Sequence, residues 1–118
     1  MNKYRKTLAA LVLSLISTCA SALEIQKAVT VTQIIPIAAI RPAAAGSQNF
    51  VAVNINPVDW GTPNCRGDSV FIAESDRHLI SILLSGIAMG KSLSFSIDDT
   101  LAPVYGTYCQ LIYITVNL

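Results

Sequence analysis

Histidine, charged residues and aromatic residues are all scarce in this chain of 118 residues. Charged residues make up 13% of the sequence, aromatic residues make up 7%, and His78 is the one histidine. A single histidine cannot build a multi-histidine metal site, and the acidic residues do not follow an EF-hand or zinc-site spacing. No serine lies in a Gly-x-Ser-x-Gly motif or has an identifiable base. We therefore expect no catalytic residue, no metal site and no cofactor.

Charge is also absent from residues 7–22, which follow a short basic start. Three cations lie within the first six residues, an apolar run occupies residues 8–16, and small residues at positions 20 and 22 suit signal peptidase. The apolar run is far shorter than the ~20 residues that span a bilayer. Residues 1–22 are therefore predicted to be a signal peptide, and residues 23–118 a single exported domain, periplasmic or secreted.

Cysteine is rare, with three in the sequence. Cys19 leaves with the signal peptide, although residues 16–19 faintly resemble a lipobox, in which this cysteine would become the lipidated first residue. Thr18 argues against that alternative, because a small residue usually precedes the lipidated cysteine. Cys65 and Cys109 remain, and in an oxidising compartment we expect them to form a structural disulfide that stabilises the domain by roughly 4 kcal/mol.

Positive charge is low once the signal peptide is removed. Five cations then face seven carboxylates, so the formal net charge changes from +1 to −2. So few cations cannot form the basic stripe that nucleic acid needs. After residue 22 no apolar run approaches bilayer length, which excludes a spanning helix from the predicted domain. Residues 34–45 and 109–118 carry at most one charge each, which indicates a subunit or ligand interface, or strands buried on both faces.

Apolar and polar residues alternate in several short segments, as they do in β-strands. The clearest alternation covers residues 92–98, in which Leu93, Phe95 and Ile97 are expected to face the core and three serines the solvent. The last segment is apolar in both phases, which predicts a central or interface strand. The five predicted strands cover residues 27–35, 50–56, 70–73, 92–98 and 109–117.

One helix is predicted between the third and fourth strands. It begins at Ser75 or Asp76, either of which can cap its first turn, and Gly90 is a suitable left-handed residue at its end. Its apolar residues recur on one face at helical spacing: Ile80, Leu83, Leu84 and Ile87.

The predicted order is β-β-β-α-β-β, which gives a mainly β domain with one helix. The OB-fold, a five-stranded Greek-key barrel, has this order. An open α+β sheet with the helix on one face is the alternative. Element order alone does not separate the two, because barrel closure depends on strand pairing.

Aromatic and amide side chains cluster near the two cysteines in the sequence. Trp60 and Asn64 precede the first cysteine, and Tyr105 and Tyr108 precede the second. A disulfide would bring these four residues together, where aromatic faces and hydrogen-bonding groups could bind a sugar. In the alternative interpretation, Trp60 packs against the disulfide as a small core.

The junction at residues 89–97 runs from the helix through Gly90 and Lys91 into the alternating strand. With the signal peptide, the domain length, the strand order and the disulfide, it resembles the B subunits of bacterial AB5 toxins, particularly the subtilase and pertussis-like group, and similar small periplasmic OB-fold proteins. The resemblance covers residues 48–118 and matches no sugar-binding residue of the family. It implies a homopentamer that binds host glycans and delivers a separate enzymatic subunit.

Two hypotheses follow for the function. The first is an exported glycan-binding subunit of a homo-oligomer. The second is a solitary periplasmic structural or interaction protein.

Overall fold

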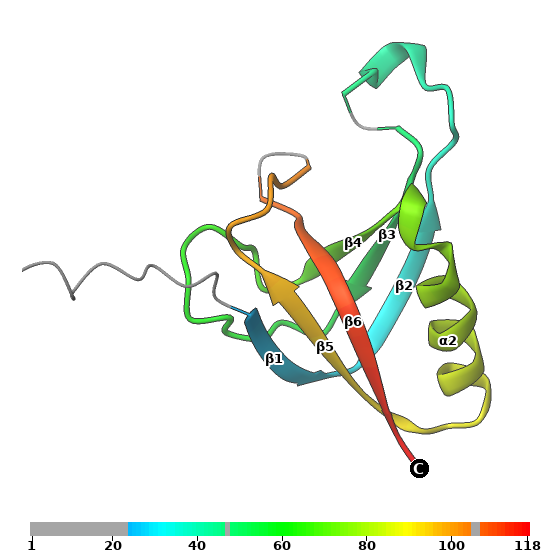
Figure 1. The fold of residues 1–118 in the computed structure, drawn as a ribbon, viewed down its shortest axis with the longest axis vertical. Coiled ribbons are helices and arrows are strands. Elements are labelled where there is room, and N and C mark those ends of the chain that lie inside the picture. The colour runs from blue at the N-terminus through cyan, green and yellow to red at the C-terminus, as the bar shows by residue number, and fades with distance from the viewer. Residues whose placement is uncertain (1–23, 47, 105–106) are drawn as a thin grey trace, which may run out of the picture.

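Six strands in one sheet and one α-helix form the described part of the protein (Figure 1). The structure is a computed structural model that describes residues 24–46, 48–104 and 107–118, so the predicted signal peptide, Cys19 and Tyr105 lie outside the described residues. The mainly β class with one helix is confirmed. The elements are β1 (Glu24–Val29), β2 (Val31–Pro36), the short 3-10 helix η2 (Pro42–Ala44), β3 (Phe50–Ile55), β4 (Ser69–Ala73), the 3-10 turn η3 (Glu74–Asp76), α2 (Arg77–Ala88), β5 (Ser92–Asp98) and β6 (Cys109–Asn117).

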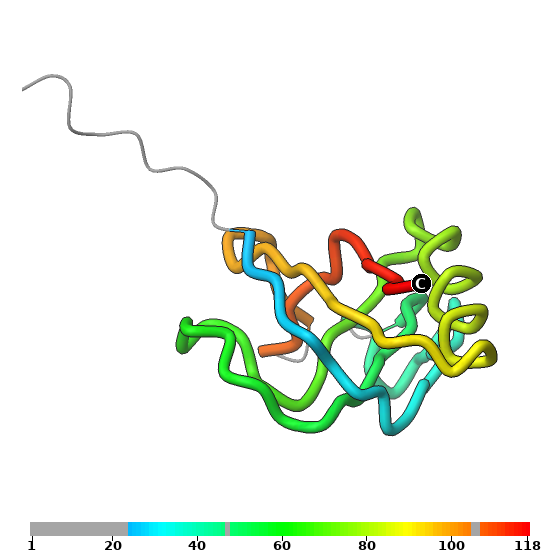
Figure 2. The backbone as a smooth tube through the Cα atoms, turned by 90° about the horizontal axis from the view of Figure 1, so that it is seen from below, coloured from blue at the N-terminus to red at the C-terminus, as the bar shows by residue number. Residues whose placement is uncertain are grey.

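The two edge strands of the sheet are neighbours in the chain. The strand order is β1-β5-β6-β4-β3-β2, yet Thr30 alone separates β1 from β2. The predicted first strand, residues 27–35, is thus two strands. The chain pairs with β5 before Thr30 and with β3 after it. At the break the Thr30 carbonyl accepts a hydrogen bond from the Asn56 N–H (2.9 Å). Figure 2 shows this turn from below. The ladder keeps two edges and is not closed, so it does not by itself show the expected barrel.

The strands β5 and β6 have the bounds that the alternation predicts. The strand β6 is central, since it pairs antiparallel with β5 on one side and parallel with β4 on the other. The predicted central position of β6 is therefore confirmed, although its outer face is not covered, since Tyr113 is 41% exposed. Leu93, Phe95 and Ile97 are buried as expected. One of the three serines differs from the expectation, because Ser96 is completely buried instead of facing solvent.

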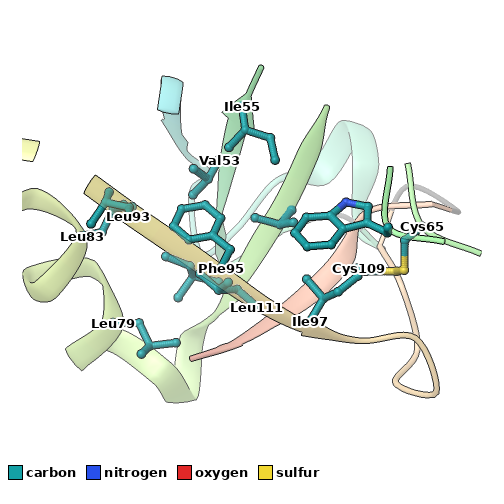
Figure 3. Close-up of a cluster of buried hydrophobic side chains, with 13 residues drawn as sticks. Val53, Ile55, Cys65, Leu79, Leu83, Leu93, Phe95, Ile97, Cys109 and Leu111 are labelled. Atoms are coloured by element: carbon teal, nitrogen blue, oxygen red, sulfur yellow. A yellow bond between two sulfur atoms is a disulfide. The ribbon is translucent and has the colours of Figure 1, made fainter. Parts of the chain in front are cut away.

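The main core lies between the concave face of the sheet and α2. Phe95 is at its centre, and Figure 3 shows Leu79 and Leu83 of α2 at one end and the Cys65–Cys109 disulfide at the other. The strands β3, β4 and β6 contribute fully buried side chains of their own: Val53, Val70, Ile72 and Leu111.

A second, smaller apolar cluster lies on the opposite face of β3 and β4. Phe50 and Phe71 meet edge to face, with ring centroids 5.7 Å apart and planes at 69°, and Ala52 is buried beside them. Edge-to-face packing of this kind stabilises by about 0.5–1.5 kcal/mol beyond the buried area. The strands β3 and β4 are therefore covered on both faces.

Only part of the predicted apolar face of α2 is buried, since Leu83 is fully buried and Ile80 packs against the main core. Leu79, Leu83 and Gly86 are buried, whereas Leu84 is 52% and Ile87 is 42% exposed. Apolar residues surround most of this helix, so helical periodicity allows two apolar stripes and cannot choose between them.

Gly86 helps to decide which stripe is buried. A Cβ at this position would lie 2.7 Å from Leu93 Cδ2 and 3.5 Å from Val116 Cγ2. The absence of a side chain therefore allows α2 to approach β5 and β6 closely along this side.

Two adjacent leucines test the orientation of the helix. Leu83→Ala should lower the free energy of unfolding by about 2–5 kcal/mol, because this side chain is fully buried. Leu84→Ala should cost less than about 1 kcal/mol, because half of the side chain is already exposed. Urea denaturation of both variants measures the difference, and equal losses would contradict the observed packing.

Candidate functional site

The disulfide joins two loops that are far apart in the sequence. Cys65 and Cys109 are bonded, with their Cα atoms 5.4 Å apart across a separation of 44 residues, which confirms the predicted pair. Cys65 lies in the segment between β3 and β4, and Cys109 begins β6. The bond therefore brings residues 56–68 next to residues 99–104 and 107–108, the described part of the β5–β6 loop.

Hydrogen bonds hold the β3–β4 segment in place around this disulfide. The Arg66 N–H donates to the Thr107 carbonyl (3.0 Å), and the Val58 N–H donates to the Gly67 carbonyl (3.0 Å). Gly67 is sterically required, since a Cβ there would lie 2.3 Å from the Val58 carbonyl oxygen. The segment thus forms a fixed wall rather than an open loop.

Arg66 and Asp68 neutralise each other beside this wall. The guanidinium Nε and Nη2 atoms donate to the two carboxylate oxygens of Asp68, with Nη2 3.0 Å from Oδ2. This hydrogen bonding lowers the pKa of Asp68 and raises the pKa of Arg66. The Arg66 guanidinium carbon also lies 5.0 Å from the centroid of the Tyr108 ring, a cation–π contact.

A pocket of about 380 Å³ opens beside the disulfide, and we call it the disulfide pocket. Its volume is within the range of small-molecule sites. Its polar side chains are those of Asn64, Asp99, Thr100 and Thr107, and Asp99 carries the one charge in the lining. The remaining lining is mostly apolar and comes from Pro63, Leu101, Ala102, Pro103 and Cys109.

The carboxylate next to the pocket is held by its own turn. The Thr100 hydroxyl and the Thr100 N–H (2.8 Å) both donate to Asp98 Oδ1, and these bonds lower the pKa of Asp98. Thr100 is thereby fixed in the pocket wall by its neighbour.

The four predicted site residues have different surroundings. Asn64 is exposed and lines the disulfide pocket. Trp60 is 3% exposed, shares the main core with both cysteines, and donates its indole N–H to the Arg66 carbonyl (3.1 Å). Tyr108 is half-buried and does not line the pocket, and Tyr105 lies outside the described residues. Of the three described residues, Asn64 is therefore the one that lines the pocket.

Asp99 and Thr100 are lining residues that the sequence interpretation missed. They follow an alternating strand and have the composition of an ordinary turn. Their place in the sequence could have indicated them, since they belong to the loop that the disulfide brings close to Asn64.

A larger hollow of about 580 Å³ lies at the opposite end of the sheet, where β1 passes into β2. Its polar side chains are those of Thr30, Asn56, Lys91 and Ser92. None of the predicted site residues reaches it.

Two general features of the described residues bear on the kind of site. They contain no helix that is both long and apolar enough to cross a membrane. Nor does any group of three or more His, Cys, Asp or Glu side chains within them have an arrangement that could hold a metal ion.

Comparison with protein-family models, curated proteins and solved structures finds no significant match to this chain.

The disulfide has a measurable contribution to stability. Replacing both Cys65 and Cys109 by Ser should lower the free energy of unfolding by about 4 kcal/mol, because the unfolded chain loses its closed loop. Urea denaturation measures this loss. Dithiothreitol should destabilise the wild-type protein and leave the double variant unchanged, and a double variant as stable as wild type would show that the bond is not structural.

Proposed function

We propose that this chain is an exported, non-enzymatic protein that binds a glycan in the disulfide pocket. The pocket lining carries the proposal. Amide, carboxylate and hydroxyl groups from Asn64, Asp99, Thr100 and Thr107 lie beside two proline rings. Sugars combine many hydroxyl groups with apolar C–H faces, so they need this mixture of hydrogen-bonding and apolar contacts.

An OB-like barrel is the architecture that we propose for the sheet. Three observations support it: the single helix between β4 and β5, the parallel pairing of β4 with β6, and one segment, residues 24–36, that supplies both edge strands. OB-folds bind oligosaccharides and oligonucleotides with their loops, including the one between the last two strands. That loop forms one wall of the disulfide pocket, and the low positive charge of the chain favours the saccharide.

Export is the second part of the proposal. The basic start and short apolar run of residues 1–22 support it, and so does the disulfide, which persists in the periplasm or outside the cell.

Self-association is the third part, and the exposed apolar residues of α2 support it. Ile82, Leu84, Ile87 and Met89 are between 42% and 55% exposed on this short helix and its cap. Leu84 and Ile87 lie on one flank of the buried stripe, and Ile82 and Met89 lie on the other. Exposed apolar pairs such as Leu84 and Ile87 in a small domain are typical of an interface. The resemblance to AB5 toxin B subunits suggests a pentamer with a separate enzymatic subunit. A solitary periplasmic interaction protein is the second candidate, and the same surface would then bind a different protein.

A glycan array with matched threonine variants tests the ligand. Thr107→Val should weaken binding by roughly 3- to 10-fold, because it removes a hydroxyl hydrogen bond. Thr32→Val is the control, since Thr32 is exposed on β2 and does not line the pocket. A protein that binds no glycan on the array would contradict the proposal and favour the solitary interaction protein.

Native mass spectrometry with matched lysine variants tests the interface. The wild-type protein should be an oligomer, and Leu84→Lys should shift it to the monomer by burying an unpaired charge. Ser81→Lys is the control, because Ser81 is an exposed polar residue of the same helix. A monomeric wild-type protein at micromolar concentration would contradict self-association.

A further inference from the structure

The outer face of β1, β5 and β6 has an unusual composition for a solvent-facing sheet. Because Leu93, Phe95 and Ile97 face the core, alternate residues of β5 and their cross-strand partners lie on the outer face. The register aligns Gln26 with Ser96 and Tyr113, and it aligns Ala28 with Ser94 and Thr115, and Ser92 with Asn117. We call these eight residues the hydroxyl face.

The hydroxyl face carries no charge over these three rows. Soluble proteins usually place charged side chains on such an outer surface, whereas here every polar group is a hydroxyl or a carboxamide. The next row is acidic, because Glu24 lies opposite Asp98. An anionic ligand would meet this acidic row, so the charge distribution favours an uncharged ligand.

Tyr113 carries the one aromatic ring of the hydroxyl face, and the other side chains of the face are smaller. Tyr113 is 41% exposed, and its row contains Ser96 on β5 and Gln26 on β1. Small neighbours such as Ser94 and Ala28 leave space beside the ring. A flat ligand could therefore stack on the phenol and still reach the hydroxyl groups of the adjacent strands.

Ser96 gives an independent indication of a ligand. It is 0% exposed, and its Oγ has no hydrogen-bond partner among the described residues. Gln26, its neighbour on β1, donates from Nε2 to Thr115 Oγ1 on β6 (3.1 Å), so the carboxamide reaches across β5 beside Ser96. A buried hydroxyl without a partner costs about 1–3 kcal/mol.

From these observations we infer that the hydroxyl face is a binding surface for an uncharged saccharide. The sugar ring stacks its C–H face on Tyr113, and its hydroxyl groups hydrogen-bond with Gln26, Ser94 and Thr115. The buried Ser96 hydroxyl gains a partner in the same complex when the Gln26 side chain turns away from Thr115 to meet the ligand. This surface shares no residue with the disulfide pocket, so it is a second site that goes beyond the proposed function.

Isothermal titration with maltohexaose, cellohexaose and chitohexaose tests the inference. At least one of these neutral oligosaccharides should bind, and Tyr113→Ala should weaken that binding by roughly 3- to 10-fold through loss of the stacked ring. Tyr113→Phe keeps the ring and should retain the affinity within about twofold. Ser94→Lys should also weaken binding, because it places a long charged side chain over the flat surface. Thermal melting checks that each variant is folded.

The variants separate this inference from the proposed function. An oligosaccharide that binds, weakened by Thr107→Val but not by Tyr113→Ala or Ser94→Lys, would overturn the inference and leave the disulfide pocket as the site. Weakening by Tyr113→Ala with no effect of Thr107→Val would support the hydroxyl face alone. If Ser94→Lys changes the mass of the oligomer but does not affect oligosaccharide binding, the hydroxyl face is a subunit interface. This result would overturn the inference. Failure of all three oligosaccharides to bind would overturn it too.

Discussion

A single residue, Thr30, connects the two edges of the sheet, and this constraint shapes the whole domain. The segment formed by β1 and β2 must pair with β5 at one edge and with β3 at the other. A flat six-stranded sheet would hold these edges several strand spacings apart. The sheet therefore curves strongly, and its concave face surrounds Phe95 and the rest of the main core.

The two ends of this curved core are covered in different ways. At one end α2 packs through Leu83 and Gly86. Because Gly86 has no side chain, the helix backbone itself lies against β5 and β6 there. At the other end Trp60 and the disulfide fill the space, supported by the hydrogen bonds of the β3–β4 segment. The loops that create the disulfide pocket are thus the same loops that cover the core. A ligand in the proposed site would therefore also stabilise this end of the domain.

The sequence predicted some elements much better than others, for physical reasons. The bounds of β5 and β6 could be predicted because alternation is unbroken over residues 92–98 and apolar residues continue through 109–117. The break at Thr30 could not, since both halves keep strand-like composition and only the hydrogen bond from Asn56 marks the turn. The buried side of α2 was also ambiguous, because the helix has two apolar stripes.

The sequence could predict which two loops form the candidate site, but not which of their side chains line it. The cysteine pair correctly brings Asn64 close to the loop that precedes Cys109. Sequence cannot show whether an aromatic ring points inward, and Trp60 is buried in the core. The hydroxyl face was hidden for a similar reason. Ser96 and Tyr113 are distant in sequence, and only the register of β5 against β6 places them side by side.

The central position of β6 has a consequence for the order of assembly. It is the last of the described strands, and it joins the pair β1–β5 to the group β4–β3–β2. The sheet therefore cannot be completed before residues 109–117 are free to pair with both β5 and β4. The disulfide likewise needs Cys109, which lies 44 residues after Cys65. The topology therefore makes folding depend on contacts between distant parts of the chain, which slows it.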